Sequence, residues 1–247
     1  MSRALSAWDT APHQAITRAA LDSLGRAERA RFGSESESLV SIYCMYPDLY
    51  LEMSRFKFVR RGAGPRTAAE IRAYCVRPDG VEVHGVSGDR QSDLASLVFL
   101  FERILSNFSA GRPAEAARYA GVLSHFVADS LSPPHAVSAD ELRAMAPDDA
   151  PAMNLHGAIE RQIPGFEIAS HKPRALAGHL VPAAAAVLDG CYSGAAENAR
   201  GLPAMVEAAL ARDDVALAPY RLRAGVRAAE ILSDALHTLI VLAEPAR

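Results

Sequence analysis

The sequence predicts an all-α protein organised as a single domain over residues 1–247. The long stretches of the chain carry apolar residues at helical rather than alternating spacing. Half of the residues are hydrophobic, which is enough to bury a substantial core. The length suits one large domain or two small ones, and no linker or internal repeat divides the chain. We therefore expect one multi-helix bundle.

The first helix is predicted over residues 10–31. Thr10 is a possible N-cap, and Pro12 lies in the first turn, where proline is tolerated. The apolar face of this helix carries residues at helical spacing: His13, Ile16, Ala20 and Leu24. The segment 33–38 is rich in serine and glutamate and is expected to be a solvated loop.

The one stretch without helical spacing lies within residues 71–86. Two short runs flank the turn residues Pro78, Asp79 and Gly80, a pattern typical of a hairpin. We expect an irregular or hairpin excursion over about 52–87.

The rest of the chain is predicted to be helical, with boundaries at glycine, proline or capping residues. Pro113 opens one helix, Ser138 caps another three residues before Glu141, and Pro164 halts a third. The predicted helices span residues 88–108, 113–131, 138–145, 154–163, 173–189, 195–211 and 217–243.

Charge, cysteine content and hydropathy limit the possible function classes. The net charge of −3 excludes a basic field of the kind that holds a nucleic-acid duplex. Three cysteines without CxxC spacing exclude a disulfide framework, although one bridge remains possible. No apolar run is long enough to form a transmembrane segment.

The beginning of the chain bears on localisation. Residues 1–10 contain no apolar core of a signal peptide, so the expected location is the cytoplasm. If residues 1–7 are instead the remnant of a processed leader, the protein is secreted or periplasmic. The oligomeric state is not predictable from these features.

The residues with the most distinctive spacing lie in "YAGVLSHFVADSLSPPHAV", residues 119–137. His125 and Asp129 are four apart on one face of an apolar helix, and a buried carboxylate there needs a partner or a metal. Two prolines end that helix before His135. His156 and Glu160 repeat the four-residue spacing. These five side chains are ligands of the type that zinc prefers, and the alternative is an ordinary helix end with incidental histidines.

Together with earlier residues, this pattern resembles a known family: the zinc-dependent phospholipases C of bacteria and the related single-strand-specific nucleases of fungi and plants. The motif elements occur in the family's order, from a tryptophan with a nearby histidine to H-xxx-D-x5-H and H-xxx-E, and they span residues 8–160. The residues that match are Trp8, His13, Asp48, His84, His125, Asp129, His135, His156 and Glu160.

The resemblance implies up to three zinc ions at the bottom of a cleft. One ion would be held by Asp48, His84, His125 and Asp129. A second would be held by the Trp8 backbone, His13 and Asp129, with Asp129 bridging the two ions. The third would be held by His135, His156 and Glu160.

The position of Trp8 leaves two alternatives open. In the family this tryptophan is the mature N-terminus, and its α-amino group and carbonyl bind zinc, whereas here seven residues precede it. Either those residues are removed, or the Trp8 backbone offers only its carbonyl and a side chain such as Asp9 completes the site.

The implied activity is zinc-dependent hydrolysis of phosphoric esters, in which metal-activated water attacks phosphorus. Asp48 would also accept a proton from that water. The expected substrate is a phosphate ester, with a phospholipase C-like phosphodiesterase favoured over a single-strand-specific nuclease or 3′-nucleotidase. A zinc-binding scaffold with diverged or lost catalysis remains the alternative of another class.

Overall fold

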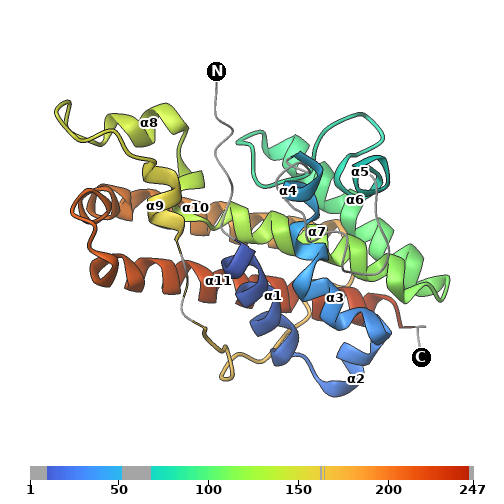
Figure 1. Ribbon diagram of the computed structural model, residues 1–247. Coiled ribbons are helices and arrows are strands. Elements are labelled where there is room, and N and C mark those ends of the chain that lie inside the picture. The colour runs from blue at the N-terminus through green and yellow to red at the C-terminus, as the bar shows by residue number, and fades with distance from the viewer. Residues whose placement is uncertain (1–9, 52–67, 162, 164, 245–247) are drawn as a thin grey trace.

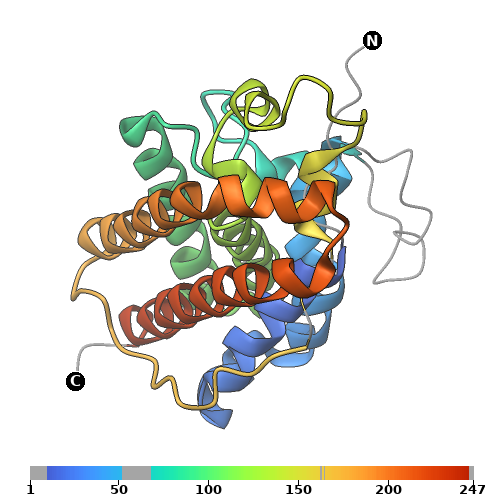
Figure 2. The same ribbon diagram turned by 90° about the vertical axis from the view of Figure 1, so that its left-hand side faces the viewer.

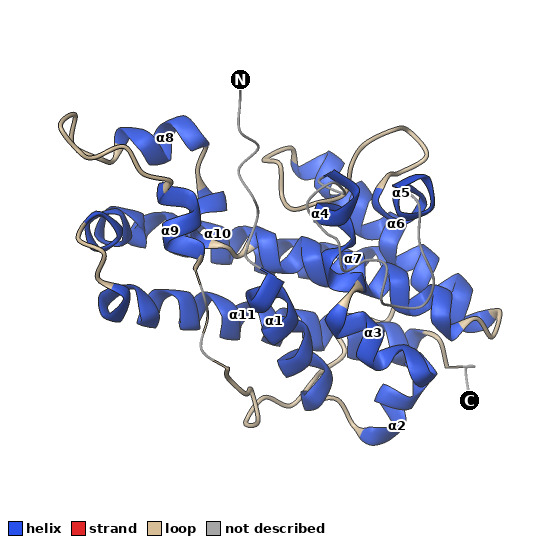
Figure 3. Ribbon diagram, viewed as in Figure 1, coloured by secondary structure: helices blue, strands red, loops and turns tan. Residues whose placement is uncertain are grey.

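The computed structural model describes residues 10–51, 68–161, 163 and 165–244. Every regular element within these residues is helical, as Figures 1 and 3 show. The only extended pairing in the described residues is a single antiparallel bridge between Val76 and Glu82. The predicted all-α class is therefore confirmed.

Two long helices, α10 (Leu180–Leu210) and α11 (Asp214–Leu242), form an antiparallel hairpin along one side of the molecule. Figure 2 shows them side by side in orange and red. Against this pair pack α6 (Arg90–Ser109) and α7 (Pro113–Ser130), which also contact each other. None of the described helices combines the length and the apolar character needed to cross a membrane.

Helix α7 lies at the centre of the bundle. Every residue in the range 120–130 is buried, so this helix has no solvated face over three turns. It contacts α1 (Thr10–Ser23), α10 and α11, as well as α6. Polar residues on α7 therefore lie in the core and must find their partners there.

The short N-terminal elements pack around α7. The predicted single helix over residues 10–31 is wrong in extent, because α1 ends at Ser23 and Gly25 adopts an extended conformation that caps the next helix. The segment 33–38 is exposed to half-buried as predicted, but it is not a loop: apart from Gly33, with φ +59°, its residues belong to two short helices. The elements that follow α1 are α2 (Arg26–Arg29), the 3-10 helix η1 (Ala30–Glu35), α3 (Ser36–Ser41), η2 (Tyr43–Met45) and α4 (Tyr46–Leu51).

The predicted hairpin over residues 71–86 is wrong in its first half. Ile71, Tyr74 and Cys75 are buried at helical spacing and belong to α5 (Ala68–Cys75). The turn predicted at Pro78 to Gly80 is present, because Gly80 has φ +88° and its N–H donates to the Arg77 carbonyl at 2.9 Å. Residues 52–67 of the predicted excursion lie outside the described residues.

The two helices predicted over 173–189 and 195–211 are one continuous helix, α10, which begins only at Leu180. The glycines between the two predicted segments serve close packing rather than a break. A Cβ on Gly190 would lie 3.0 Å from the Ile231 side chain, and one on Gly194 would lie 2.8 Å from Leu131. Here tertiary packing outweighs the weak helix propensity of glycine.

The remaining short elements follow α7 and lie near the turn between α10 and α11. They are η4 (Pro133–Ala136), α8 (Ala139–Ala144) and α9 (Leu155–Glu160). A small apolar cluster of its own joins α8 and α9 to the facing ends of α10 and α11. The three cysteines are free and buried, so no disulfide contributes to the fold.

Gly121 allows the closest backbone approach to α7. A Cβ at this position would lie 2.4 Å from the carbonyl carbon and the Cβ of Tyr43, a distance that real Cβ atoms do not tolerate. Because the obstructing atoms belong to backbone, they cannot simply rotate away. Only glycine therefore allows η2 to lie directly on α7.

We expect Gly121→Ala to lower the free energy of unfolding by about 1–3 kcal/mol, since the added methyl overpacks a closed contact. Urea denaturation measures the effect. Gly178→Ala is the matched control, because a Cβ there meets nothing within 4 Å and φ is not positive. Equal stability of the two variants would contradict the close approach.

Candidate metal centre

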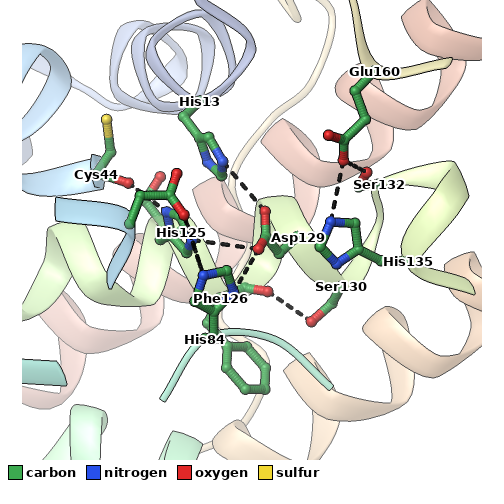
Figure 4. A network of polar contacts seen from close by, with 12 residues as sticks. His13, Cys44, His84, His125, Phe126, Asp129, Ser130, Ser132, His135 and Glu160 are labelled. Atoms are coloured by element: carbon green, nitrogen blue, oxygen red, sulfur yellow. Dashed lines mark hydrogen bonds and ion pairs between the residues drawn. The ribbon is translucent and has the colours of Figure 1, made fainter. Parts of the chain in front are cut away.

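Two helices, α1 and α7, bring the first group of donor atoms together inside the core. His125 and Asp129, four residues apart on α7, point the same way, and His13 of α1 faces them (Figure 4). All three side chains are fully buried. The His13 and His125 rings stack with centroids 4.2 Å apart and planes within 5°. We call His13, His125 and Asp129 the first group.

The Asp129 carboxylate faces imidazoles on two sides. Its Oδ1 lies 3.3 Å from His13 Nε2, and its Oδ2 lies 2.7 Å from His84 Nδ1 and 3.4 Å from His125 Nε2. Neither oxygen accepts a hydrogen bond of ordinary geometry. A buried carboxylate without hydrogen bonds is strongly unfavourable unless a cation compensates it. The two oxygens are directed towards different donors, as a carboxylate that bridges two ions requires.

His125 is oriented by a backbone contact from η2. Its Nδ1 lies 2.8 Å from the Cys44 carbonyl oxygen, which can only accept, so Nδ1 carries the proton and donates. The Nε2 lone pair is thereby directed at the carboxylates, an arrangement typical of metal-binding histidines. Because only one ring nitrogen remains available, His125 can bind one ion and not two.

The second group consists of Asp48, His84 and His125. His84 Nε2 lies 3.2 Å from Asp48 Oδ1 and 3.3 Å from His125 Nε2, and the Asp48 oxygen lies 3.7 Å from His125 Nε2. The His84 side chain is 27% exposed, in contrast to the buried first group. The second group therefore forms the side of the centre that opens towards solvent.

The loop that carries His84 is fixed at several points. Gly85 passes so near Asp129 that a Cβ would lie 3.2 Å from the aspartate Cβ. The next two residues are hydrogen-bonded to helices: Val86 N–H donates to Ser130 Oγ at 3.0 Å, and the Ser87 hydroxyl donates to Asp93 at 2.7 Å. These contacts hold His84 over Asp129 although no helix contains it.

The third group lies beyond the end of α7 and consists of His135, His156 and Glu160. His135 Nε2 is 3.1 Å from Glu160 Oε1, and His156 Nε2 is 3.1 Å from Glu160 Oε2. Ser132 Oγ donates to Glu160 Oε1 at 2.5 Å and orients the carboxylate (Figure 4). Both Nε2 atoms and Oε2 have no hydrogen-bond partner.

The donor separations agree with those around one small cation. Two ligands at about 2.0 Å from a tetrahedral zinc are about 3.3 Å apart. The nitrogen and oxygen atoms within the three groups are separated by 3.1–3.7 Å where direct contacts occur. Ordinary histidine–carboxylate hydrogen bonds would instead leave the buried atoms satisfied. The residues present therefore fit metal ions in donor type and spacing, and the Asp129 oxygens and Glu160 Oε2 have no other hydrogen-bond partner.

The carboxyl groups of the site are held in their ionised forms. Burial alone raises the pKa of Asp129, but the His125, His135 and His84 imidazoles outweigh it, and the pKa lies well below its ordinary value. The pKa of Glu160 is lowered despite burial by its contacts with His135 and His156. The ionised carboxylate is the form that binds cations.

The histidines differ according to their surroundings. Burial lowers the pKa of His125 and outweighs the attraction of Asp129, so its neutral form is favoured. Burial also acts to lower the pKa of His84, but the Asp129 and Asp48 carboxylates raise it to about 10. The pKa of His135 is raised by Asp129 and Glu160 in the same way, against the effect of burial. Without a metal, these two imidazoles supply the positive charge that the carboxylates need.

Eight of the nine predicted ligands lie in these three groups, and Trp8 lies outside the described residues. The groups differ from the predicted ligand sets in one respect: His125 is the residue common to the first and second groups, whereas Asp129 belongs only to the first and approaches the second through its 2.7 Å contact with His84. Sequence reasoning missed Ser132 and the Cys44 carbonyl. The position of Ser132 between Asp129 and His135 could have indicated its role. A backbone carbonyl has no signature in the sequence.

Histidines outside the centre have ordinary partners. His171 Nε2 lies 2.9 Å from Asp234, and His237 Nδ1 lies 2.5 Å from Glu28. Asp234 also accepts a hydrogen bond from the Arg174 N–H at 3.1 Å. Neither pair belongs to one of the groups of three converging donors found among the described residues.

Comparisons with protein-family models, with curated proteins and with solved structures each return no match for this chain. No relative therefore supplies a ligand set, a substrate or a reaction. The function has to be argued from the donor atoms themselves.

We expect removal of bound metal to destabilise the protein, because the buried carboxylates lose their compensating cations. Dialysis against EDTA should lower the unfolding temperature by about 5–10 °C, measured by circular dichroism. EDTA preloaded with zinc is the control and should have no effect. Identical melting curves under both treatments would mean that the groups bind no structural metal.

Proposed function

We propose that this protein is a zinc-dependent hydrolase of phosphoric esters, a phosphodiesterase of the phospholipase C-like type. The observation that supports the proposal best is the convergence of three donor groups, two of which share His125 and are joined by the 2.7 Å contact between Asp129 and His84. Histidine nitrogens and carboxylate oxygens at tetrahedral spacing favour zinc over magnesium or calcium, which prefer oxygen ligands alone.

Because His125 can bind only one ion, the described side chains supply three donors to the second group and three to the third, and His13 and Asp129 to the first. A three-ligand set leaves a coordination position for water or substrate, as in catalytic zinc sites. Zinc bound there lowers the pKa of a water ligand towards about 7 and polarises a phosphoryl oxygen. This chemistry needs no basic surface, which agrees with the net charge of −3.

The side chains of the second and third groups define where a substrate would approach. His84 and His135 are each 27% exposed at their side chains, whereas His13 and Asp129 are fully buried. A phosphate ester would therefore reach the centre across His84 and His135. Asp48, with its carboxylate next to His84, is the residue we assign to accept a proton from the attacking water.

The other candidate activities share this centre. A single-strand-specific nuclease or 3′-nucleotidase would use the same donors and differ in the walls around them. A zinc-binding scaffold without turnover would retain the same donors as well. The experiments below separate these outcomes.

The zinc stoichiometry tests the centre directly. Inductively coupled plasma mass spectrometry should find close to three zinc ions per chain, and Asp129→Asn should retain about one, because the first group loses a donor and the second loses the carboxylate in contact with His84. Asp234→Asn is the matched control, since it alters another buried aspartate that contacts a histidine but lies outside the centre. One ion or none in the unaltered protein would overturn the three-ion centre.

Hydrolysis of bis-p-nitrophenyl phosphate tests the reaction. We expect zinc-dependent release of p-nitrophenol, and a loss of about 100-fold or more in kcat for Asp48→Asn as general base catalysis is removed. The zinc content of the variant, measured in parallel, separates lost catalysis from lost metal. Three bound ions without turnover would favour the scaffold.

The substrate class follows from the same preparation. Phosphatidylcholine micelles, a single-stranded oligonucleotide and a 3′-nucleotide are offered separately at equal phosphate concentration. Preferred release of phosphorylcholine supports the phospholipase C-like proposal, whereas preferred cleavage of the oligonucleotide or the 3′-nucleotide replaces it with the nuclease alternative.

A further inference from the structure

Helix α9 carries two of the three donors of the third group although it is only six residues long. His156 lies in its first turn and Glu160 at its end. An isolated helix of this length is not stable, because the free-energy cost of nucleating a helix exceeds the stabilisation from the few hydrogen bonds that it forms. At its N-terminus, the Asn154 side chain accepts the Gly157 N–H at 3.0 Å. The other end must be held from outside.

Arg221 of α11 holds that end. Its Nε donates to the Ile159 carbonyl at 2.7 Å, and its Nη2 donates to the Ala158 carbonyl at 2.6 Å. These carbonyls belong to the last turn of α9, where no intrahelical donor is available. The guanidinium also lies at the helix end that carries partial negative charge. Asp214 Oδ1 accepts from both Nη1 and Nη2 at 3.1 Å.

The burial of Arg221 distinguishes this contact from an ordinary surface pair. The residue is only 4% exposed, and its acidic partner Asp214 has a side chain that is 71% exposed. Burying the guanidinium costs desolvation free energy. A carboxylate that is itself exposed to solvent compensates only part of this cost. The planar guanidinium contacts two successive carbonyls at once, which a lysine ammonium cannot do in the same geometry.

The helix is shorter than its sequence pattern predicts for the same reason. The predicted helix over 154–163 ends at Glu160, because Arg161 turns to an extended backbone with ψ 124°. The carbonyls of Ala158 and Ile159 are thereby left to Arg221. Glu160 follows directly after this clamped pair, and its carboxylate reaches both His135 and His156 at 3.1 Å.

We propose that Arg221 is a positioning residue for the third metal site. By holding the Ala158 and Ile159 carbonyls, it sets the place of Glu160 and His156 relative to His135. Metal ligands must be held to within about 0.5 Å, so loosening the last turn of α9 weakens this site before any other. The inference rests on the metal centre of the proposed function and adds to it a residue that touches neither metal nor substrate.

The test compares Arg221→Lys and Arg221→Met with the unaltered protein by competitive zinc titration against a chromophoric chelator. We expect the affinity of one of three sites to fall about 10- to 100-fold, as for other residues that support metal ligands. The two remaining sites should keep their affinities. Arg223→Met, an exposed arginine on the same helix, is the matched control and should leave all three sites unchanged.

A double variant identifies the affected site. Glu160→Gln removes a donor of the third group, so adding Arg221→Lys to it should cause no further loss of zinc affinity. If Arg221→Met fails to fold, Arg221→Lys carries the test, because it keeps the charge and most of the side-chain volume.

Two results would overturn the inference alone: three sites with unchanged affinities in Arg221→Lys, or a parallel weakening of all three, which indicates general destabilisation. Fewer than three sites in the unaltered protein would overturn the metal centre and this inference together.

Discussion

The burial of the Asp129 carboxylate is the constraint on which the centre of this protein depends. Helix α7 has no solvated face around this residue, and neither carboxylate oxygen accepts an ordinary hydrogen bond. A negative charge in such a position requires positive charge or a metal ion close by. Imidazoles from α1, from α7 itself and from the loop after α5 meet this requirement. The packing of α1 and of the loop after α5 against α7 agrees with this requirement.

Close backbone packing fixes the positions of the imidazoles that surround the Asp129 carboxylate. Gly121 lets η2 rest on α7, one turn from His125, and the Cys44 carbonyl then fixes which nitrogen of His125 faces the carboxylates. Gly85 similarly lets the His84 loop cross over Asp129. At both glycines, the absence of a side chain allows two backbone segments to approach closely next to a candidate metal-binding residue. The same close backbone contacts therefore pack the core and orient the donor atoms.

The third group depends on different parts of the molecule. Its donors follow α7 in sequence but are held by α11 through Arg221, by Ser132, and by the small apolar cluster at the ends of α10 and α11. The first two groups share His125 and are joined by the contact between Asp129 and His84, so a change in one affects the other. The third group shares no donor with the other two, although its His135 also contributes to the lowered pKa of Asp129.

The sequence by itself determined the helical class and the ligand pairs on single helices, because both depend on local spacing. His125 with Asp129, His156 with Glu160, and the proline stop before His135 are readable within a few residues. Tertiary structure alone decided that α10 runs unbroken past Gly190 and Gly194, that residues 71–75 are helical, and that Arg221 ends α9. These outcomes depend on partners distant in the chain, such as Ile231 for Gly190, Leu131 for Gly194 and Arg221 for Ile159, and local propensity is too weak to specify them. The same holds for the meeting of His13, His84 and Asp129, which only the packed bundle brings about.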